Sequence, residues 1–296
     1  MGQYRPFFSI VIPTYHRPQQ LAACLQTLTH LDYPRDRFEV IVVDDGGEIS
    51  LDGVLALFKE VLCITLLRQP HAGPAGARNV GAATAKGDFI AFTADDCAPA
   101  ADWLDSLATR FTTRPDCALG GKIINALPGN ICSTASHLLI TYLYAYYNAL
   151  PAAAGFFTPN NLAIPTDRFR AMGGFDVSFV TATGEDREFC DRWLHTGYCM
   201  VYAPEVMVAH AHPLTFRAFC RQHFNYGRGT FRYRMMQAQR ANRRMSLEPV
   251  RFYFNLLRYP LTMFQGKKIR LAMLLGISQA ANAAGFFWER IRERVV

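Results

Sequence analysis

Short apolar runs alternate with helical segments through the first 92 residues, and this alternation constrains the fold more than any other feature of the sequence. Continuous apolar runs of this length are typical of buried strands, and apolar residues spaced three and four apart are typical of helices. Strands separated by helices predict βαβ units and a mainly parallel sheet. The expected strands are residues 7–13, 38–43, 63–67 and 89–92, and the expected helices are 21–31, 51–58 and 76–85.

Polar or special residues follow three of these strands. Two of the strands end directly in Pro13-Thr14-Tyr15 and in Asp44-Asp45. The strand 89–92 is followed, two residues later, by Asp95-Asp96. In parallel sheets, ligands bind beyond the carboxyl ends of the strands. The adjacent carboxylates Asp95 and Asp96 repel each other and resist desolvation, so they require a compensating positive charge. A divalent cation that carries a phosphorylated ligand meets this need, because Mg²⁺ and Mn²⁺ prefer carboxylate oxygens. A solvated loop is the alternative for an isolated Asp-Asp pair.

The region after residue 118 is less regular. Residues 131–157 are apolar and rich in tyrosine, which fits either a buried helix pair or a surface that faces an acceptor or a membrane. Helical spacing of apolar residues predicts a helix over 187–195, opened by Glu185 and Asp186. An acidic pair at a helix start can also serve only as a cap that the helix dipole favours.

Charge divides the chain into an acidic part and a basic part. Residues 1–213 hold 15 Lys and Arg against 21 Asp and Glu, whereas residues 214–270 hold 13 against the single acid Glu248. A basic, aromatic-rich segment of this kind predicts binding to a polyanion, which could be anionic lipid, a phosphorylated acceptor or nucleic acid. The uncharged residues 271–288 fall short of the roughly 20 apolar residues of a spanning helix, so an interfacial or core helix is expected there.

The eight cysteines are scattered, with no C-x-x-C pair. In a chain of this length the pattern predicts reduced thiols and a cytosolic compartment. The first six residues lack the apolar core of a secretory signal, so no such signal is expected.

Five motifs then occur in order, namely Ser9-Ile10-Val11-Ile12-Pro13-Thr14-Tyr15, Val40-Ile41-Val42-Val43-Asp44-Asp45-Gly46, Ala77-Arg78-Asn79, Thr93-Ala94-Asp95-Asp96 and Gly184-Glu185-Asp186. Together they resemble the family 2 glycosyltransferases of the GT-A fold, over roughly residues 7–232. The resemblance implies an α/β fold with a Rossmann-like, mostly parallel sheet, flanking helices and a C-terminal helical extension that is basic and apolar. It also implies a non-processive, inverting enzyme of polysaccharide synthesis that moves a sugar from a nucleotide-diphosphate sugar to an acceptor hydroxyl. The expected division is a nucleotide-sugar-binding half (1–125), an acceptor-binding half (126–213) and the extension (214–296).

The resemblance assigns the donor site to the first three motifs. Pro13, Thr14 and Tyr15 are expected to line the base pocket, with Tyr15 offering a ring for stacking. Asp45 resembles the carboxylate that accepts a hydrogen bond from the base. Arg78 resembles a residue near the nucleotide and its phosphates, where guanidinium donors suit anionic oxygens. UDP is the commonest donor nucleotide of the family, so a UDP-sugar is expected.

The family's metal motif is often Asp-x-Asp, and here Ala94 occupies its first position. Asp95 is then expected to contact the ribose or the water shell of the metal, and Asp96 to ligate Mn²⁺ or Mg²⁺ directly. A histidine after the acceptor helix often lies near the metal, and His210 is preferred to His212 for this role. The alternative is a strand in which one imidazole is merely hydrogen-bonded.

Asp186 is the expected base that takes the proton of the acceptor hydroxyl, with Glu185 beside it. The metal and Arg78 would neutralise the departing diphosphate. The alternative for the Asn-Asn pair at 160–161 is a turn. The alternative for residues 221–229 is a solvated basic helix. The residues expected to line the acceptor or donor-sugar pocket are Asn160, Asn161, Glu185, Trp193, Arg221 and Arg228.

Two other classes of protein share some of these features. A nucleotidyltransferase of similar α/β fold typically carries a glycine-rich phosphate loop, but residues 13–17 contain no glycine. A non-catalytic module that binds a membrane or another polyanion has no need for Asp45, Arg78, Asp96 and Asp186 together. The expected acceptor is lipid-linked or a cell-envelope or exopolysaccharide glycan. The basic extension predicts peripheral contact with anionic lipid at the inner face of the cell membrane, and no nucleic-acid partner is expected.

Overall fold

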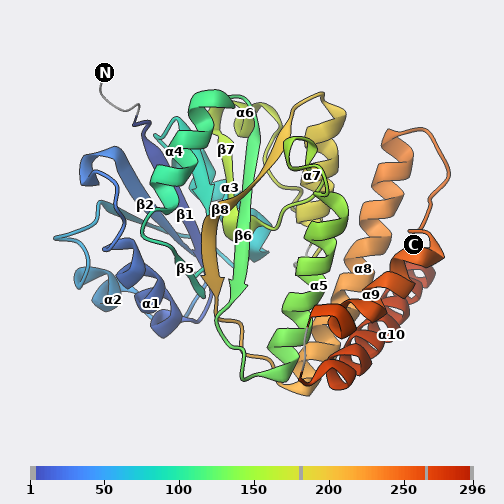
Figure 1. Ribbon diagram of the computed structural model, residues 1–296. Helices are drawn as coiled ribbons and strands as arrows, with labels where there is room; N and C mark the ends of the chain where they lie inside the picture. Colours follow the sequence, from blue (N-terminus) through green and yellow to red (C-terminus); the bar gives the residue numbers. More distant parts are fainter. Residues whose placement is uncertain (1–4, 180–182, 264–265, 294–296) are drawn as a thin grey trace.

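The computed structural model describes residues 5–179, 183–263 and 266–293. At its centre lies an eight-stranded sheet with strand order β3-β2-β1-β4-β7-β6-β8-β5. Figure 1 shows helices on both faces of this sheet and a separate group of C-terminal helices beside it. Residues 1–4, in which no secretory signal is expected, lie outside the described residues. Residues 294–296, at the end of the extension, also lie outside them.

The first half of the sheet is parallel, as the sequence predicts. Its strands are β1 (Phe8–Thr14), β2 (Phe38–Asp44), β3 (Ile64–Arg68) and β4 (Phe89–Phe92). The connecting helices are α1 (Pro18–Leu28), α2 (Asp52–Ala56) and α3 (Gly73–Thr84). α1 and α3 begin three residues before the expected starts, because Pro18 and Pro74 occupy the first helical turns, where proline costs no hydrogen bond.

The small residues of α3 allow it to lie close to the sheet. A Cβ atom added to Gly81 would lie 2.5 Å from Cγ1 of Val11 on β1 and 3.1 Å from Cγ2 of Val43 on β2. This close approach fixes the position of Arg78, which lies three residues earlier on the same helix.

The second half of the sheet is mixed. It contains β5 (Cys97–Pro99), β6 (Ala118–Asn125), β7 (Leu162–Pro165) and β8 (Met200–His210). β7 is antiparallel to both β4 and β6, β5 is antiparallel to β8, and β6 is parallel to β8. The helices of this half are α4 (Trp103–Thr113), α5 (Ile131–Tyr147), α6 (Thr166–Ala171) and α7 (Glu185–His195).

The tyrosine-rich stretch 131–157 forms one helix rather than a helix pair. α5 begins at the cap Asn130, whose side chain accepts a hydrogen bond of 2.9 Å from Ser133 N. After α5 the chain makes two short 3-10 turns, Pro151–Ala153 and Pro159–Asn161, because two prolines and a glycine interrupt the helical pattern between 151 and 159. Leu139 and Leu143 of α5 pack in the core.

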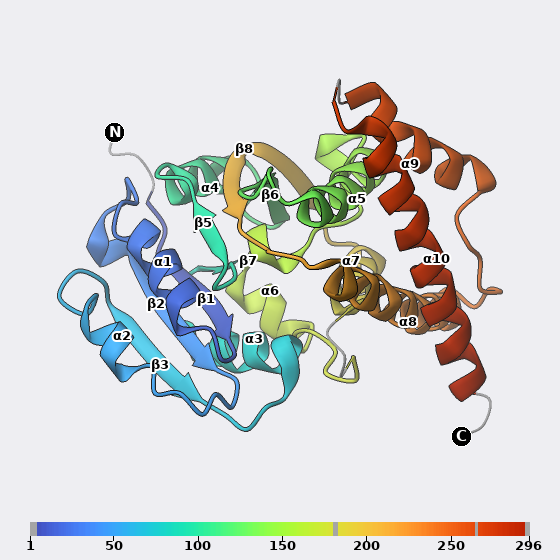
Figure 2. The same ribbon diagram turned by 90° about the horizontal axis from the view of Figure 1, so that it is seen from below.

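The basic extension forms α8 (Phe216–Arg240), α9 (Val250–Met263) and α10 (Lys268–Arg292). Figure 2 shows α10 crossing α8. At the crossing, a Cβ atom on Gly227 would lie 1.8 Å from Asn282 O, and one on Gly285 would lie 1.9 Å from Phe224 O. Glu289 of α10 is fully buried and pairs with Arg228 and Arg232 of α8. The helix expected over 271–288 therefore packs on the fold.

The expectation of eight reduced thiols is wrong for Cys117 and Cys199, which form a disulfide. The neighbouring residues Ala118 and Met200 pair in the parallel register of β6 and β8. Adjacent strands therefore place the two cysteines side by side, with their Cα atoms 4.7 Å apart, although they are 82 residues apart in sequence. The other six cysteines are free.

Candidate active site

One cleft of about 920 Å³ opens beyond the carboxyl ends of β1, β2 and β4, with α5, α7 and α8 on its other side. It brings together predicted residues from stretches that lie far apart in the sequence. The predicted site residues that line it are Pro13, Thr14, Tyr15, Asp45, Arg78, Asp95, Asp96, Asn160, Glu185, Asp186, His210 and Arg221. The groups expected to bind the donor, the metal and the acceptor thus share one cavity.

Asp95 is almost completely buried between β1 and the loop after β4. Its Oδ2 accepts a hydrogen bond of 2.8 Å from Thr14 Oγ1, and Arg17 Nη1 lies 3.3 Å from its Oδ1. The same guanidinium nitrogen lies 3.2 Å from Oδ2 of Asp96. Burial and the adjacent Asp96 charge raise the pKa of Asp95 despite these contacts. Arg17, which no motif singled out, supplies positive charge to both carboxylates.

Asp96 lies between two imidazoles. His210 Nε2 is 3.1 Å from its Oδ1, and His212 Nδ1 is 3.4 Å from its Oδ2. Burial alone would raise the pKa of Asp96, but hydrogen bonds from both histidines and the charge of Arg17 hold it well below its usual range. The chain leaves β8 at His210, and a hydrogen bond of 2.8 Å from Ala211 N to Asp96 O keeps the histidine pair beside the carboxylate.

Asp96, His210 and His212 fit a divalent cation. One ligand atom from each residue lies within 4.8 Å of the other two. A carboxylate with two imidazoles is a mixed oxygen and nitrogen set, which suits Mn²⁺ better than Mg²⁺ because Mg²⁺ demands nearly pure oxygen coordination. Gln222 Oε1 lies 2.8 Å from Nε2 of His212, a contact of the kind that orients metal-binding imidazoles.

Asp45 joins the cleft to the start of α3. Its Oδ1 accepts hydrogen bonds from Gln69 Nε2 at 2.6 Å and Ala72 N at 2.9 Å, and its Oδ2 accepts one from Gly73 N at 2.9 Å. These bonds satisfy backbone donors at the N-terminus of α3 that would otherwise lack partners. Asp45 therefore fixes the turn that borders the cleft as well as lining it.

Tyr15 and His71 form a flat aromatic surface at the same end of the cleft. Their rings stack with centroids 4.3 Å apart and planes 25° apart, and Tyr15 is 42 % exposed. His71 Nδ1 lies 2.9 Å from Asp45 Oδ2, which fixes the ring. The sequence analysis did not predict His71 as a site residue. Its position shortly after a strand, like that of Asp45, could have indicated it.

Glu185 and Asp186 lie at the N-terminus of α7. Glu185 Oε1 is 3.4 Å from Arg78 Nη1, and each side chain is less than a tenth exposed. Burial, together with the charge of Asp186, raises the pKa of Glu185. Burial also raises the pKa of Asp186, against the opposing charge of Arg187. Oδ1 of Asp186 accepts a hydrogen bond of 2.8 Å from Arg187 N, so the carboxylate is held at the first helical turn.

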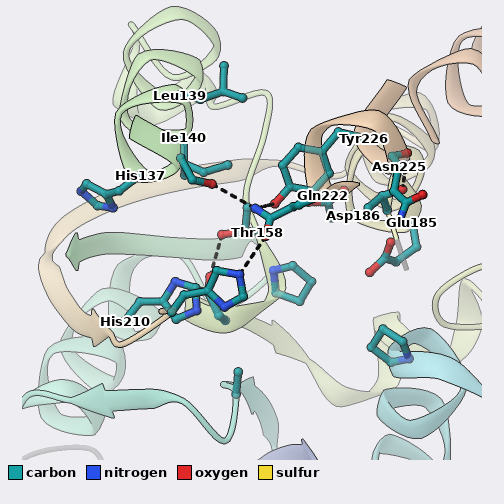
Figure 3. Close-up of a pocket in the computed structure, with 18 of the residues that line it drawn as sticks. His137, Leu139, Ile140, Thr158, Glu185, Asp186, His210, Gln222, Asn225 and Tyr226 are labelled. Carbon is teal, nitrogen blue, oxygen red and sulfur yellow. Dashed lines mark hydrogen bonds between the residues drawn. The ribbon is translucent and has the colours of Figure 1, made fainter. Parts of the chain in front are cut away.

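A polar network centred on Gln222 of α8 joins His212 to α5 and extends toward the acidic pair. Figure 3 shows Glu185 and Asp186 beside Asn225 and Tyr226 of α8, with Gln222 extending across the cavity. Gln222 Nε2 donates to Tyr226 and to Ser136 of α5, at 2.9 Å in each case. These hydrogen bonds were not predicted from the sequence, because the residues that form them come from different helices and no local pattern gives the relative positions of those helices.

Three predicted residues lie outside the cleft and have contacts inside the protein. The Asn161 amide donates to Lys122 O and Val206 O and accepts from Trp103 Nε1. Trp193 is fully buried and donates to Cys199 O. Arg228 Nε lies 2.6 Å from Oε2 of the buried Glu289. Asn160, by contrast, lines the cleft, and its Oδ1 accepts a hydrogen bond of 2.7 Å from Thr158.

Comparison with known proteins agrees with this geometry. The family model described as glycosyl transferase family 2 matches residues 9–171, and that of glycosyl transferase family group 2 matches residues 94–288. Glycosyltransferase AglE of Haloferax volcanii is 24 % identical over 234 residues, which cover 78 % of this chain and 75 % of that protein. Pre-mycofactocin glycosyltransferase of Mycobacterium tuberculosis is 29 % identical over 225 residues, which cover 74 % of this chain but only 46 % of the mycobacterial protein.

Solved structures show the same fold. The mannosyltransferase PcManGT of Pyrobaculum calidifontis, in complex with GDP-Man and Mn²⁺, matches with a TM-score of 0.63 and 20 % identity over 95 % of this chain and 76 % of that one. Residues 1–349 of Staphylococcus aureus TarS match with a TM-score of 0.61 and 14 % identity over 98 % and 92 % of the two chains. The expected GT-A architecture is confirmed, and the chain belongs to glycosyl transferase family 2 and is a glycosyltransferase.

Proposed function

We propose that this glycosyltransferase moves a sugar, with inversion, from a nucleoside-diphosphate sugar to an acceptor hydroxyl, with the help of a divalent cation. One observation carries the proposal. A single cleft holds a carboxylate with two imidazoles at one place and the acidic pair Glu185 and Asp186 at the start of α7 at another. The family match assigns glycosyl transfer, so neither a nucleotidyltransferase nor a non-catalytic module is carried forward.

The donor is proposed to lie along the ends of β1, β2 and β4. Pro13 and Thr14 border the base, Tyr15 stacks on it, and Asp45 accepts a hydrogen bond from it. Asp95 contacts the ribose. PcManGT was solved with GDP-Man and TarS with UDP-GlcNAc, so nucleotide-sugar donors with two different bases occur among the structural neighbours. A UDP-sugar remains the expected donor, as the commonest in the family.

Asp96, His210 and His212 are proposed to hold Mn²⁺ in preference to Mg²⁺. When bound, the cation would neutralise charge on the departing nucleoside diphosphate. PcManGT was solved with Mn²⁺, which supports this choice of metal. Arg78 and Arg221 line the same cleft and offer guanidinium donors to phosphate oxygens.

Asp186 is proposed as the base. It accepts the proton of the acceptor hydroxyl as the hydroxyl oxygen attacks the anomeric carbon from the side opposite the diphosphate, so the configuration inverts. Burial raises the pKa of Asp186, which strengthens the carboxylate as a proton acceptor, and the positive charge of Arg187 opposes this shift. Glu185 and Asn160 line the sugar pocket, while the buried Asn161 and Trp193 support its walls from behind.

The proposed division of labour follows the sequence. Residues 1–125 supply the donor side of the cleft and residues 126–213 supply the acceptor side. The extension 214–296 closes the cleft through α8, from which Arg221, Gln222 and Tyr226 line it.

The extension is also proposed to hold the enzyme at anionic lipid on the inner face of the cell membrane. Among the described residues, α10 alone is long and apolar enough to cross a membrane, with a mean hydropathy of 1.3 and a third of that stretch buried, and one such helix is weak evidence of a span. The exposed apolar residues of α9 and α10 include Val250, Phe254, Ile269, Met273, Trp288 and Ile291. Exposed basic residues of the same helices are Arg251, Arg258, Lys268, Arg270 and Arg292. A lipid-linked acceptor or a cell-envelope or exopolysaccharide glycan suits this location, and no nucleic-acid partner is proposed.

The test uses a panel of UDP- and GDP-sugars with Mn²⁺, and measures release of nucleoside diphosphate and transfer to added glycosides. Asp186→Asn is expected to lower transfer about 10²–10⁴-fold with nucleotide binding retained, because it removes the base alone. Asp96→Ala should weaken Mn²⁺ binding, read as a loss of the Mn²⁺-induced thermal shift. Asp116→Asn, at an exposed carboxylate outside the cleft, is the matched control. Full transfer by Asp186→Asn would overturn the role of the base, and an unchanged Mn²⁺ shift in Asp96→Ala would overturn the metal site.

A further inference from the structure

Beyond Asp186, the cleft continues into a second compartment between α5, α7, α8 and α9. Its lining includes Tyr147, Phe156, Arg187, Arg234, Phe252 and Tyr253. It is rich in aromatic rings and contains two guanidinium groups.

Arg187 is the residue after Asp186, and its guanidinium lies against two rings of this compartment. Its Cζ is 5.0 Å from the ring centroid of Tyr147 and 4.5 Å from that of Phe156. Aromatic faces hold the plane of a guanidinium in place, while its edge carries the N–H donors. The Tyr147 side chain accepts a hydrogen bond from Arg187. A guanidinium has five N–H donors, so donors are left for a ligand.

Arg187 differs from the neighbouring arginines because no carboxylate in the described part of the chain forms a direct ion pair with it, although its charge acts on the adjacent Asp186. Arg192, five residues later on α7, pairs with Glu188, and Arg234 across the compartment pairs with Glu248. No carboxylate of residues 5–179, 183–263 or 266–293 lies within ion-pair distance of Arg187. A half-buried guanidinium, fixed on aromatic rings and facing a cleft without a carboxylate partner, is a receptor for an oxyanion.

We propose that Arg187 binds an oxyanion of the acceptor, a carboxylate or a phosphate, while the rings of Tyr147 and Phe156 border the acceptor sugar. This inference rests on the proposed function, in which Asp186 takes the proton of the acceptor hydroxyl. Because Arg187 and Asp186 are consecutive in the first turn of α7, an anionic group at the guanidinium places a nearby hydroxyl of the same molecule at the carboxylate. The acceptor is therefore an anionic glycan, charged through a uronic acid or through a phosphate ester.

The test measures binding, so that it does not depend on transfer. The full chain is saturated with UDP and Mn²⁺, and is titrated calorimetrically with 4-nitrophenyl β-glucoside, its 6-phosphate and 4-nitrophenyl β-glucuronide. The three probes differ only at the sixth carbon of the sugar. A charge-assisted contact with Arg187 is expected to make at least one anionic probe about 10- to 150-fold tighter than the glucoside. The phosphate and the glucuronide separate the two sources of the oxyanion.

Arg187→Gln keeps much of the side-chain length and removes the charge. It should abolish the advantage of the anionic probe and leave binding of the glucoside unchanged, whereas Arg187→Lys should retain part of the advantage. Arg168→Gln is the matched control, because Arg168 also lies over a ring, at 4.6 Å from the centroid of Tyr198, but outside the cleft. Equal binding of all three probes by the unaltered protein, or no binding by any, would overturn the inference.

Two further outcomes separate this inference from related ideas. If Arg187 acts only by tuning Asp186, Arg187→Gln would leave the preference for the anionic probe intact, and the inference would be wrong. Asp186→Asn keeps Arg187 and should keep the preference. If the unaltered protein keeps this preference but shows no transfer with any donor of the panel, the oxyanion site would be supported and the proposed function would be wrong.

Discussion

The guanidinium of Arg78 lies 3.4 Å from Oε1 of Glu185, and this ion pair joins α3 beneath the donor side of the cleft to α7 on the acceptor side. Both side chains are less than a tenth exposed. Arg78 Nε and Glu185 Oε2 have no hydrogen-bond partner among the residues that the structure describes. Buried charges with unsatisfied atoms are costly, which suggests that the pair is retained for its position in the cleft rather than for stability.

Removal of one partner should be more harmful than removal of both. We expect Arg78→Met to lower the free energy of unfolding at pH 8 by about 3–5 kcal/mol, because it leaves a buried carboxylate without its cation. The double variant Arg78→Met with Glu185→Leu should recover most of this loss. Urea unfolding measures both. Arg68→Gln, which removes an exposed ion pair with Asp52, should cost no more than about 1 kcal/mol. Additive losses in the double variant would contradict the expectation.

Glu185 should also make stability depend on pH. Its pKa in the folded protein is raised from the ordinary value of 4.5 by burial and by Asp186, so the folded state holds a proton that the unfolded state has lost. The stabilisation from this proton is complete below pH 4.5 and is lost as pH rises through the folded value. Relative to the unaltered protein, Glu185→Gln should therefore gain in free energy of unfolding between about pH 5 and pH 8. A pH-independent difference between the two proteins would exclude this account.

Much of the donor side of the cleft could be predicted because its residues follow strands directly. Asp45 follows β2, and Asp95 and Asp96 follow β4, the two parallel strands on either side of β1. A local pattern there predicts both the strand and the edge of the sheet at which it ends. Arg78 was likewise placed by a local pattern, because the small residues around it predict a helix. Local sequence therefore carries most of the information for this half of the fold.

The rest of the cleft depends on contacts that no local pattern encodes. Arg17 reaches both carboxylates from the start of α1, and Gln222 connects His212 to α5 from the middle of a basic helix. The sequence pattern over 216–240 predicts an amphipathic basic helix but not the element against which it packs. Trp193, an aromatic residue near the acidic pair, was predicted to line the pocket. It is instead fully buried and does not line the cleft.

The crossing of α8 and α10 provides a test of whether α10 packs on the protein. Gly285→Ala should lower the free energy of unfolding by about 1–3 kcal/mol, because its Cβ would meet Phe224 O and the helices would have to separate. Gly276→Ala, on the same helix but with no atom within 4 Å of the added Cβ, should instead raise it by roughly 1 kcal/mol. Thermal and urea unfolding of the two variants measure the difference. Equal effects at both positions would indicate that α10 does not pack against α8.

The exposed surface of α9 and α10 should bind vesicles that contain anionic lipid. Arg258 and Arg270 lie among exposed apolar side chains such as Phe254 and Met273, so electrostatic attraction and apolar burial act together. The full chain is expected to sediment with phosphatidylglycerol vesicles at low salt, to remain in solution with phosphatidylcholine vesicles, and to be released by high salt. Arg258→Gln and Arg270→Gln should each weaken binding by about 1 kcal/mol, whereas Lys59→Gln, on the far side of the sheet, should have no effect. Equal binding to both kinds of vesicle would assign the contact to the apolar residues alone, and no binding to either would remove the proposed membrane location.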